Sequence, residues 1–225
     1  MVESGCGLGI VADPVRVPPN DDRWMGDTLG LVAIVAGPAA GVSFPVLRAR
    51  GEGFVAADWG PITVVEVYFP PSLSMVDCGG RLEELAACLQ SLAPRPVVVA
   101  GDFNTHSTMW GSPRTSPRGR LIEDWAVAED LRIFNQGSVN IFVGHWGGSI
   151  VDLTWANSAA LRRVSEWRVL DRVETGSDHL YIWFRAILTR DGTILSPTAA
   201  LSKRYRWALK KLDEEKLLAY IQTTC

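Results

Sequence analysis

The sequence predicts a mixed α/β domain in which helices and strands pack in layers. Short apolar runs rich in Val and Ile, which are typical of strands, recur along the chain between segments with apolar residues at helical spacing. Because helices and strands are mixed rather than strictly alternating, the sheet is expected to contain both parallel and antiparallel strands. A chain of 225 residues is long enough for one sizeable domain.

The first elements follow from local composition. Strands are expected at residues 29–37 and 61–69, which are rich in Val and Ile and bounded by Gly or Pro. A helix is expected within residues 79–96, where leucines recur at helical spacing and two prolines end the pattern. A buried strand at 96–101 then leads into the polar loop GDFN.

The second half of the chain continues this mixture. A Ser/Pro/Arg loop at 112–119 precedes an amphipathic helix at 118–131. Three further strands are expected at 149–157, 164–171 and 180–188. From about residue 188 the character changes to a turn-rich linker followed by a charged helix at 203–222, which indicates an appendage to the domain.

Composition excludes several classes of protein. The formal net charge of −3 is no electrostatic footprint of a nucleic-acid binder, although one face can still be locally basic. The four cysteines form no CxxC pair, which is typical of reduced thiols in an intracellular protein. No apolar run is long enough to span a membrane, and the N-terminal residues do not resemble a signal peptide.

Three predicted strand ends carry acids, an amide and a histidine. Asp102 and Asn104 follow one strand, Asp152 lies inside an apolar strand, and Asp178 and His179 precede another. A buried aspartate needs a partner, and a histidine held by a carboxylate is the obvious one. Such a pair near a carboxylate and an amide suits phosphodiester hydrolysis with a hard cation such as Mg²⁺, although each signal alone is more typical of a turn.

The combination of GDFN (101–104), VDLTW (151–155) and GSDH (176–179) resembles the endonuclease/exonuclease/phosphatase superfamily. The segments VVVAGDFNTHSTMWGS, RGRLIEDWAVAEDLRIFN and SDHLYIWF are similar, more narrowly, to the apurinic-like endonuclease domain of insect-type non-LTR (LINE-type) retrotransposons. The resemblance implies an α/β fold of the α+β four-layer sandwich type, with two mixed β-sheets packed face to face and flanked by helices. This domain would cover residues 1–187, and residues 188–225 would lead toward a reverse transcriptase region.

The resemblance also implies a role for each matching residue. Asp102 and Asn104 would position the attacking water and the scissile phosphate. Asp152 would orient His179, the catalytic histidine, and Tyr68 would donate a hydrogen bond to phosphate.

Two acids are implied as metal ligands. Asp178 would approach the metal, and Asp13 stands where the family usually has the glutamate that is the main ligand for Mg²⁺, with Mn²⁺ as an alternative. Aspartate is one methylene shorter than glutamate, and Mg²⁺ requires near-ideal octahedral geometry. The family's first core strand and the helix after it are expected to be missing before Met1. Their loss would leave backbone N–H and C=O groups of the neighbouring strands without hydrogen-bond partners.

The implied function is a Mg²⁺-dependent endonuclease of a retrotransposon polyprotein, acting in the nucleus. It would nick double-stranded DNA to leave a 3′-hydroxyl that primes reverse transcription, with the reverse transcriptase region as partner and no membrane involved. Three alternatives stay open: a truncated inactive remnant, a phosphoesterase acting on small phosphate esters, and a nucleic-acid-binding remnant. The last would contact phosphates through the loop that carries Arg114, Arg118 and Arg120.

Overall fold

The computed structural model describes residues 6–37, 44–145 and 147–188. Its central layer is a six-stranded sheet in which only β6 and β7 run parallel, so the sheet is mixed, as predicted. In spatial order the strands are β4 (Val46–Gly51), β5 (Phe54–Trp59), β6 (Ile62–Tyr68), β7 (Val97–Asp102), β11 (Asp152–Asn157) and β8 (Leu131–Ile133).

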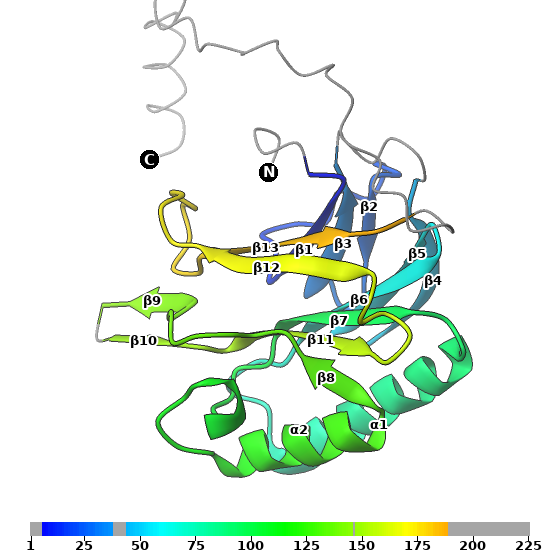
Figure 1. The fold of residues 1–225 in the computed structure, drawn as a ribbon. Coiled ribbons are helices and arrows are strands. Elements are labelled where there is room, and N and C mark those ends of the chain that lie inside the picture. The colour runs from blue at the N-terminus through cyan, green and yellow to red at the C-terminus, as the bar shows by residue number, and fades with distance from the viewer. Residues whose placement is uncertain (1–5, 38–43, 146, 189–225) are drawn as a thin grey trace, which may run out of the picture. The chain divides into compact units, whose positions relative to one another are not determined.

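Two helices cover one face of this sheet (Figure 1). The helix α1 (Met75–Leu92) is the crossover that a parallel β6–β7 pair requires, and α2 (Pro117–Ala128) lies between β7 and β8 in the chain. Ser74 caps α1 by accepting a hydrogen bond from the Asp77 backbone N–H at 3.1 Å. Buried leucines of α1 pack with Phe103, Trp125 and Trp155 in the main core.

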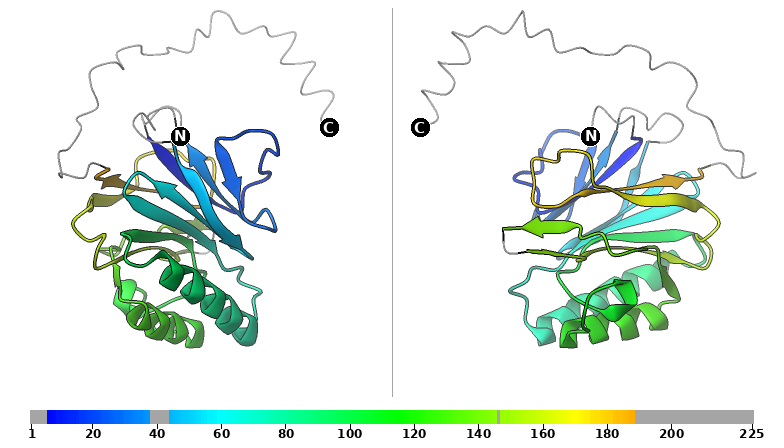
Figure 2. Two further views of the ribbon diagram at one scale, coloured as in Figure 1. Left: turned by 90° about the vertical axis from the view of Figure 1, so that its right-hand side faces the viewer. Right: turned by 60° about the vertical axis from the view of Figure 1, so that its left-hand side comes forward.

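Two antiparallel groups of strands form the second layer, on the other face of the sheet. One is the sheet of β1 (Leu8–Ala12), β3 (Val32–Ala36) and β2 (Trp24–Gly26), and the other is the pair β12 (Val164–Leu170) and β13 (Tyr181–Ala186). Ile34 packs with Val55 and Val64 of the central sheet, and Val164 packs with Val98. Figure 2 shows both groups on the side opposite the helices. The predicted α+β sandwich is confirmed, but in the described residues helices flank it on one face only and the second layer contains antiparallel strands rather than a mixed sheet.

Short elements complete the described part. A 3-10 turn, η2 (Thr108–Trp110), follows β7, and a small hairpin of β9 (Phe142–Gly144) and β10 (Gly147–Ser149) precedes β11. Among the described residues, no helix combines the length and the apolar character needed to cross a membrane.

Most predicted elements form close to their expected places, with three corrections. The helix α1 begins at Met75 rather than near residue 79, because Ser74 caps it. Asp152 is the first residue of β11 rather than an interior one. The hairpin of β4 and β5 was not predicted, since the exposed arginines of β4 interrupt its apolar pattern. The helix expected at 203–222 lies outside the described residues.

Candidate active site

The central sheet brings three of the predicted site residues into one row. Tyr68 at the end of β6 lies opposite Asp102 at the end of β7, and Asp102 lies opposite Asp152 at the start of β11. Residues directly opposite each other on neighbouring strands project from the same face of a sheet. Because β6 and β7 are parallel and β11 is antiparallel to them, all three side chains lie at the same edge.

His179 joins this row through Asp152. Its Nδ1 lies 2.8 Å from Oδ2 of Asp152, and both side chains are partly buried. The hydrogen bond that the His179 ring donates to Asp152 raises the pKa of His179, and the charges of Asp152, Asp102 and Asp178 act in the same direction against the opposing effect of burial. The imidazole is therefore held through Nδ1, and Nε2 is not bound by Asp152.

The small hairpin positions the segment that carries His179. Phe142 of β9 forms an isolated bridge with His179, and the two rings meet edge to face with centroids 5.3 Å apart. The Val143 N–H donates to the Asp178 carbonyl at 2.7 Å, so a second backbone interaction joins β9 to this segment. Asp178 is more exposed, and its Oδ1 lies 4.0 Å from Nε2 of His179.

Asp102 and Asn104 form a compact unit at the end of β7. The backbone N–H of Asn104 donates to one carboxylate oxygen of Asp102 at 2.8 Å, and its amide donates to the other at 2.7 Å. Burial, followed by the charge of Asp152, raises the pKa of Asp102 to about 7, while the bonds from Asn104 and the charge of His179 lower it. A carboxyl with a pKa near neutrality can exchange a proton at the working pH of most enzymes.

Tyr68 lies beside Asp102 on the side away from Asp152, and Asp13 is near enough for its charge to act on Tyr68. Partial burial, then the charges of Asp13 and Asp102, raise the pKa of Tyr68. Its phenol therefore stays protonated at neutral pH and can donate a hydrogen bond. Asp13 is exposed, and it has a left-handed backbone with φ of 47° just after β1.

A third carboxyl lies deeper on the same face. Glu66 lies opposite Ala100, which lies opposite Thr154, one row below Asp102. Glu66 is fully buried, and neither its carboxylate oxygens nor the Thr154 hydroxyl has a hydrogen-bond partner among the described residues. Burial, with the charges of Asp152 and Asp102, raises the pKa of Glu66 well above its usual range. The sequence analysis missed Glu66, although a charge inside the apolar run ITVVEVY is the same signal that pointed to Asp152.

Asn135 is a second residue that the sequence analysis missed. Its amide nitrogen donates to the Asp152 carbonyl and its amide oxygen accepts from the Thr154 N–H, both at 2.8 Å. This pair of bonds fixes the start of β11, and thus the backbone of the residue that holds His179. Nothing in the sequence distinguishes Asn135 from an ordinary loop asparagine.

Comparisons with known proteins show which family the chain belongs to. The model of the endonuclease-reverse transcriptase family matches residues 62–183, more than half of the chain, and these residues include the whole row. The chain belongs to the endonuclease-reverse transcriptase family. An 83-residue stretch, 37% of the chain, is 23% identical to the RNA-directed DNA polymerase from mobile element jockey of Drosophila melanogaster, of which it spans 8%.

Solved structures show the same fold. The endonuclease domain of TRAS1, a telomere-specific non-LTR retrotransposon, aligns with a TM-score of 0.63 and 22% identity over 84% of this chain and 82% of that one. The 3′-5′ exonuclease NExo of Neisseria meningitidis aligns with a TM-score of 0.56 and 15% identity over 80% of each chain. The resemblance to retrotransposon endonucleases that the sequence predicts is confirmed: the family model matches more than half of the chain, and the TRAS1 endonuclease domain shares its fold.

The family implies a divalent cation, and the donors of this site match its chemistry. Asp13, Asp102 and Asp178 offer oxygen ligands, and the repulsion that Asp152 exerts on Asp102 is the kind that a cation offsets. Within the described ranges, no three His, Cys, Asp or Glu side chains are close enough to enclose a metal ion. A divalent cation that is held by one or two carboxylates together with substrate phosphate needs no such group.

The three arginines of the Ser/Pro/Arg segment differ in their surroundings. Arg114 is exposed beside His106 and Pro113, and Arg120 is exposed and paired with Glu123 at 3.3 Å. Arg118 is half-buried, and its guanidinium donates to backbone carbonyls. Two of the three therefore present their charge to solvent.

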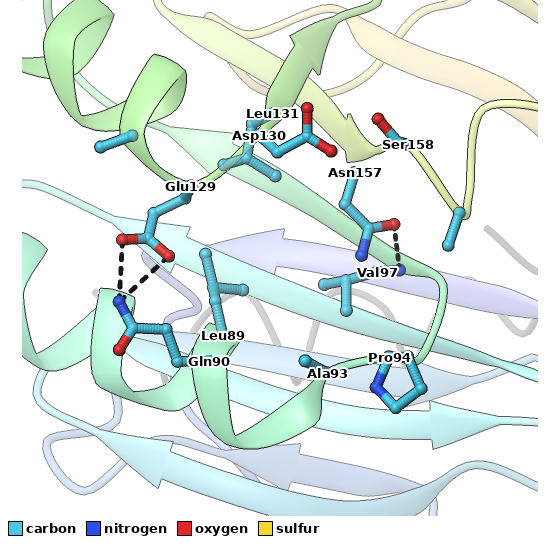
Figure 3. Close-up of a pocket in the computed structure, with 12 residues that line it drawn as sticks. Leu89, Gln90, Ala93, Pro94, Val97, Glu129, Asp130, Leu131, Asn157 and Ser158 are labelled. Atoms are coloured by element: carbon cyan, nitrogen blue, oxygen red, sulfur yellow. Dashed lines mark hydrogen bonds between the residues drawn. The ribbon is translucent and has the colours of Figure 1, made fainter.

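A pocket of about 450 Å³ lies at the opposite end of β7 and β11 (Figure 3). It lies between the C-terminal ends of the two helices, next to Val97 and Asn157. Five residue steps of β7, each of about 3.3 Å, lead from Val97 to Asp102, so the pocket is about 17 Å from the row of Tyr68, Asp102 and Asp152, which we call the acid row. Glu129 and Asp130 line it, and the carboxylate of Glu129 faces the amide of Gln90. Among the described residues that line this pocket there is no histidine, lysine or arginine, so it offers no cationic side chain to a phosphate ester.

Proposed function

We propose that this chain is a Mg²⁺-dependent DNA endonuclease that nicks double-stranded target DNA by hydrolysing one phosphodiester bond. The observation that supports this most is the row of Tyr68, Asp102 and Asp152 across three neighbouring strands, completed by His179 on Asp152. It places a proton acceptor, a phenol donor and a carboxylate-held imidazole on one face, as phosphodiester hydrolysis requires.

In this mechanism Asp102, deprotonated, accepts a proton from the attacking water, and Asn104 orients that water and the phosphate. The water oxygen forms a bond to phosphorus, and the bond from phosphorus to the 3′-oxygen breaks. The 3′-oxygen leaves and takes up a proton from solvent water, and Asp102 later releases its proton to solvent, so the products are a 3′-hydroxyl and a 5′-phosphate. His179, kept protonated by Asp152, and the Tyr68 phenol donate hydrogen bonds to the phosphate oxygens as negative charge develops on them.

We assign the cation to Asp13 and Asp178, with Mg²⁺ as the natural ion and Mn²⁺ as a substitute. When bound, the ion supplies positive charge that neutralises the phosphate. Asp13 carries a side chain one methylene shorter than the family's usual glutamate, so we expect weaker binding of Mg²⁺ than in a chain with glutamate at this position.

The polyprotein context supplies the rest of the proposal. We propose that residues 1–187 form the nuclease domain and that residues 188–225 link it to a reverse transcriptase region, for which the nicked 3′-hydroxyl is the primer in the nucleus. Arg114 and Arg120 are the proposed DNA contacts, because both are exposed. Their charges can bind phosphates locally in spite of the net charge of −3.

The test is a supercoiled-plasmid assay with the full chain in Mg²⁺, Mn²⁺ and EDTA, followed by extension of the nick with a DNA polymerase. We expect open circles with either ion, none in EDTA, and extension without prior end repair. Hydrolysis of small phosphate esters without plasmid nicking would favour the phosphoesterase instead. A gel shift without cleavage would favour the nucleic-acid-binding remnant. The absence of both binding and cleavage would favour the truncated inactive remnant.

A further inference from the structure

The guanidinium of Arg118 is bound to four backbone carbonyl oxygens. Its Nη1 donates to Pro70 at 3.1 Å and to Asn104 at 3.4 Å. Its Nη2 donates to Pro71 at 3.3 Å and, at a shorter distance, to Leu73. A planar guanidinium with five N–H donors suits this task, because it can reach acceptors on two segments at once.

The two segments joined by Arg118 each follow a strand that ends in a residue of the acid row, Tyr68 in β6 and Asp102 in β7. Pro70 follows Tyr68 by two residues, and the segment 70–73 leads from β6 into α1. Asn104 lies two residues after the end of β7 and has a left-handed backbone with φ of 45°, a conformation that among residues with a side chain is adopted mainly by Asn and Asp. The bond to the Asn104 carbonyl helps to hold this conformation close to Asp102.

The start of α2 fixes Arg118 in turn. Ser116 caps the helix by accepting from the Gly119 N–H at 3.0 Å, and its own N–H donates to the His106 carbonyl at 2.9 Å. A Cβ at Gly119 would overlap with that same carbonyl oxygen, so only glycine permits this close approach. Arg118 therefore projects from a helix end that is docked directly on the loop after Asn104.

We propose that Arg118 is a positioning residue of the active site, which sets the spacing between the segments that carry Tyr68 and Asn104. The proposal rests on the nuclease function proposed above. It gives Arg118 a role different from that of Arg114 and Arg120, which are the proposed DNA contacts. Its donors are directed at carbonyl groups rather than at solvent, so it acts on the reaction through the groups it holds.

The two possible roles of Arg118 make different predictions for DNA binding. A phosphate contact raises affinity through counterion release, so its loss weakens binding and lowers the slope of log affinity against log salt by about one. A positioning residue leaves that slope unchanged and lowers the rate of the chemical step. A misplacement of about 1 Å in an active site can cost about 100-fold in rate.

The experiment compares the full-length chain with Arg118→Ala, Arg118→Lys and Arg114→Ala in plasmid nicking, at several salt concentrations. For Arg118→Ala we expect kcat to fall about 10- to 100-fold, with KM and the salt slope nearly unchanged and partial rescue by added guanidinium. Arg118→Lys should also be slow, because an ammonium keeps the charge but lacks the planar fork. A raised KM with a lower salt slope, or full activity in Arg118→Lys, would overturn the proposal.

A second measurement is independent of activity. Hydrogen–deuterium exchange should be faster in peptides covering 69–74 and 103–107 of Arg118→Lys than of wild type, and unchanged there in Arg114→Ala. If wild type does not nick DNA, the nuclease function fails, and this exchange alone decides whether Arg118 holds the two segments. Unchanged exchange in Arg118→Lys would overturn the positioning role even if the wild-type chain is active.

Discussion

Replacing Glu66 by Gln should stabilise the protein at neutral pH and remove part of the pH dependence of its unfolding. The side chain is fully buried, both carboxylate oxygens lack partners among the described residues, and burial together with Asp152 and Asp102 raises its pKa. A raised pKa favours the folded state at low pH. That advantage is complete below the unfolded pKa and is lost as the pH rises from there through the folded pKa.

The size of the effect follows from linkage. Each pH unit within that window removes up to about 1.4 kcal/mol from the free energy of unfolding, so a rise from about pH 5 to about pH 7 removes up to about 3 kcal/mol. Glu66→Gln keeps the size of the side chain but cannot ionise. Because Asp102 is present in both proteins, its own titration largely cancels in the difference between the two curves.

The assay is urea unfolding followed by tryptophan fluorescence at a series of pH values, with Glu83→Gln on the exposed face of α1 as the matched control. We expect the curves of wild type and Glu66→Gln to diverge as the pH rises and those of wild type and Glu83→Gln to stay parallel. Parallel curves for Glu66→Gln, or lower stability of Glu66→Gln at neutral pH, would refute the reasoning. They would mean that Glu66 is ionised and paired in the folded protein.

Three further predictions follow from the same geometry. Asp152→Asn should lower the pKa of His179, measured by NMR titration, and reduce the nicking rate about 100-fold or more; an unchanged pKa would contradict the assigned pair. The pH–rate profile in Mg²⁺ should rise as Asp102 loses its proton, with an apparent pKa of about 7 or lower because the cation offsets the charge of Asp152, and a profile with no rising limb would exclude Asp102 as the base. Gly101→Ala should destabilise by about 2 kcal/mol or more, since φ is 148° and a Cβ would overlap with the Val67 carbonyl oxygen. Gly80→Ala, on the open surface of α1, should instead stabilise by about 0.5–1 kcal/mol, and equal melting temperatures for both variants would contradict the contrast.

The sequence predicted the parts of the fold that local pattern determines. The strands around Val65, Val99 and Leu153 are continuous apolar runs, because both faces of the central sheet are covered. The hairpin of β4 and β5 was missed because Arg48 and Arg50 face solvent on an edge strand, where polar residues are tolerated.

The candidate site was predictable only in part, for a different physical reason. Motif spacing pointed to Asp102, Asp152 and His179, yet only strand register shows that Tyr68, Asp102 and Asp152 share a row. The sequence shows a basic segment around Arg118 but not that its guanidinium binds carbonyl groups, because side-chain partners depend on tertiary contacts.

The most direct test of the active site is the nicking of supercoiled plasmid in Mg²⁺ by wild type, His179→Ala and Asp102→Ala, with circular dichroism to confirm that each variant is folded. The assigned roles predict Mg²⁺-dependent nicking by wild type that falls by about 100-fold or more in each folded variant. Nicking that survives both substitutions would show that the row at the ends of β6, β7 and β11 is not where DNA is cut.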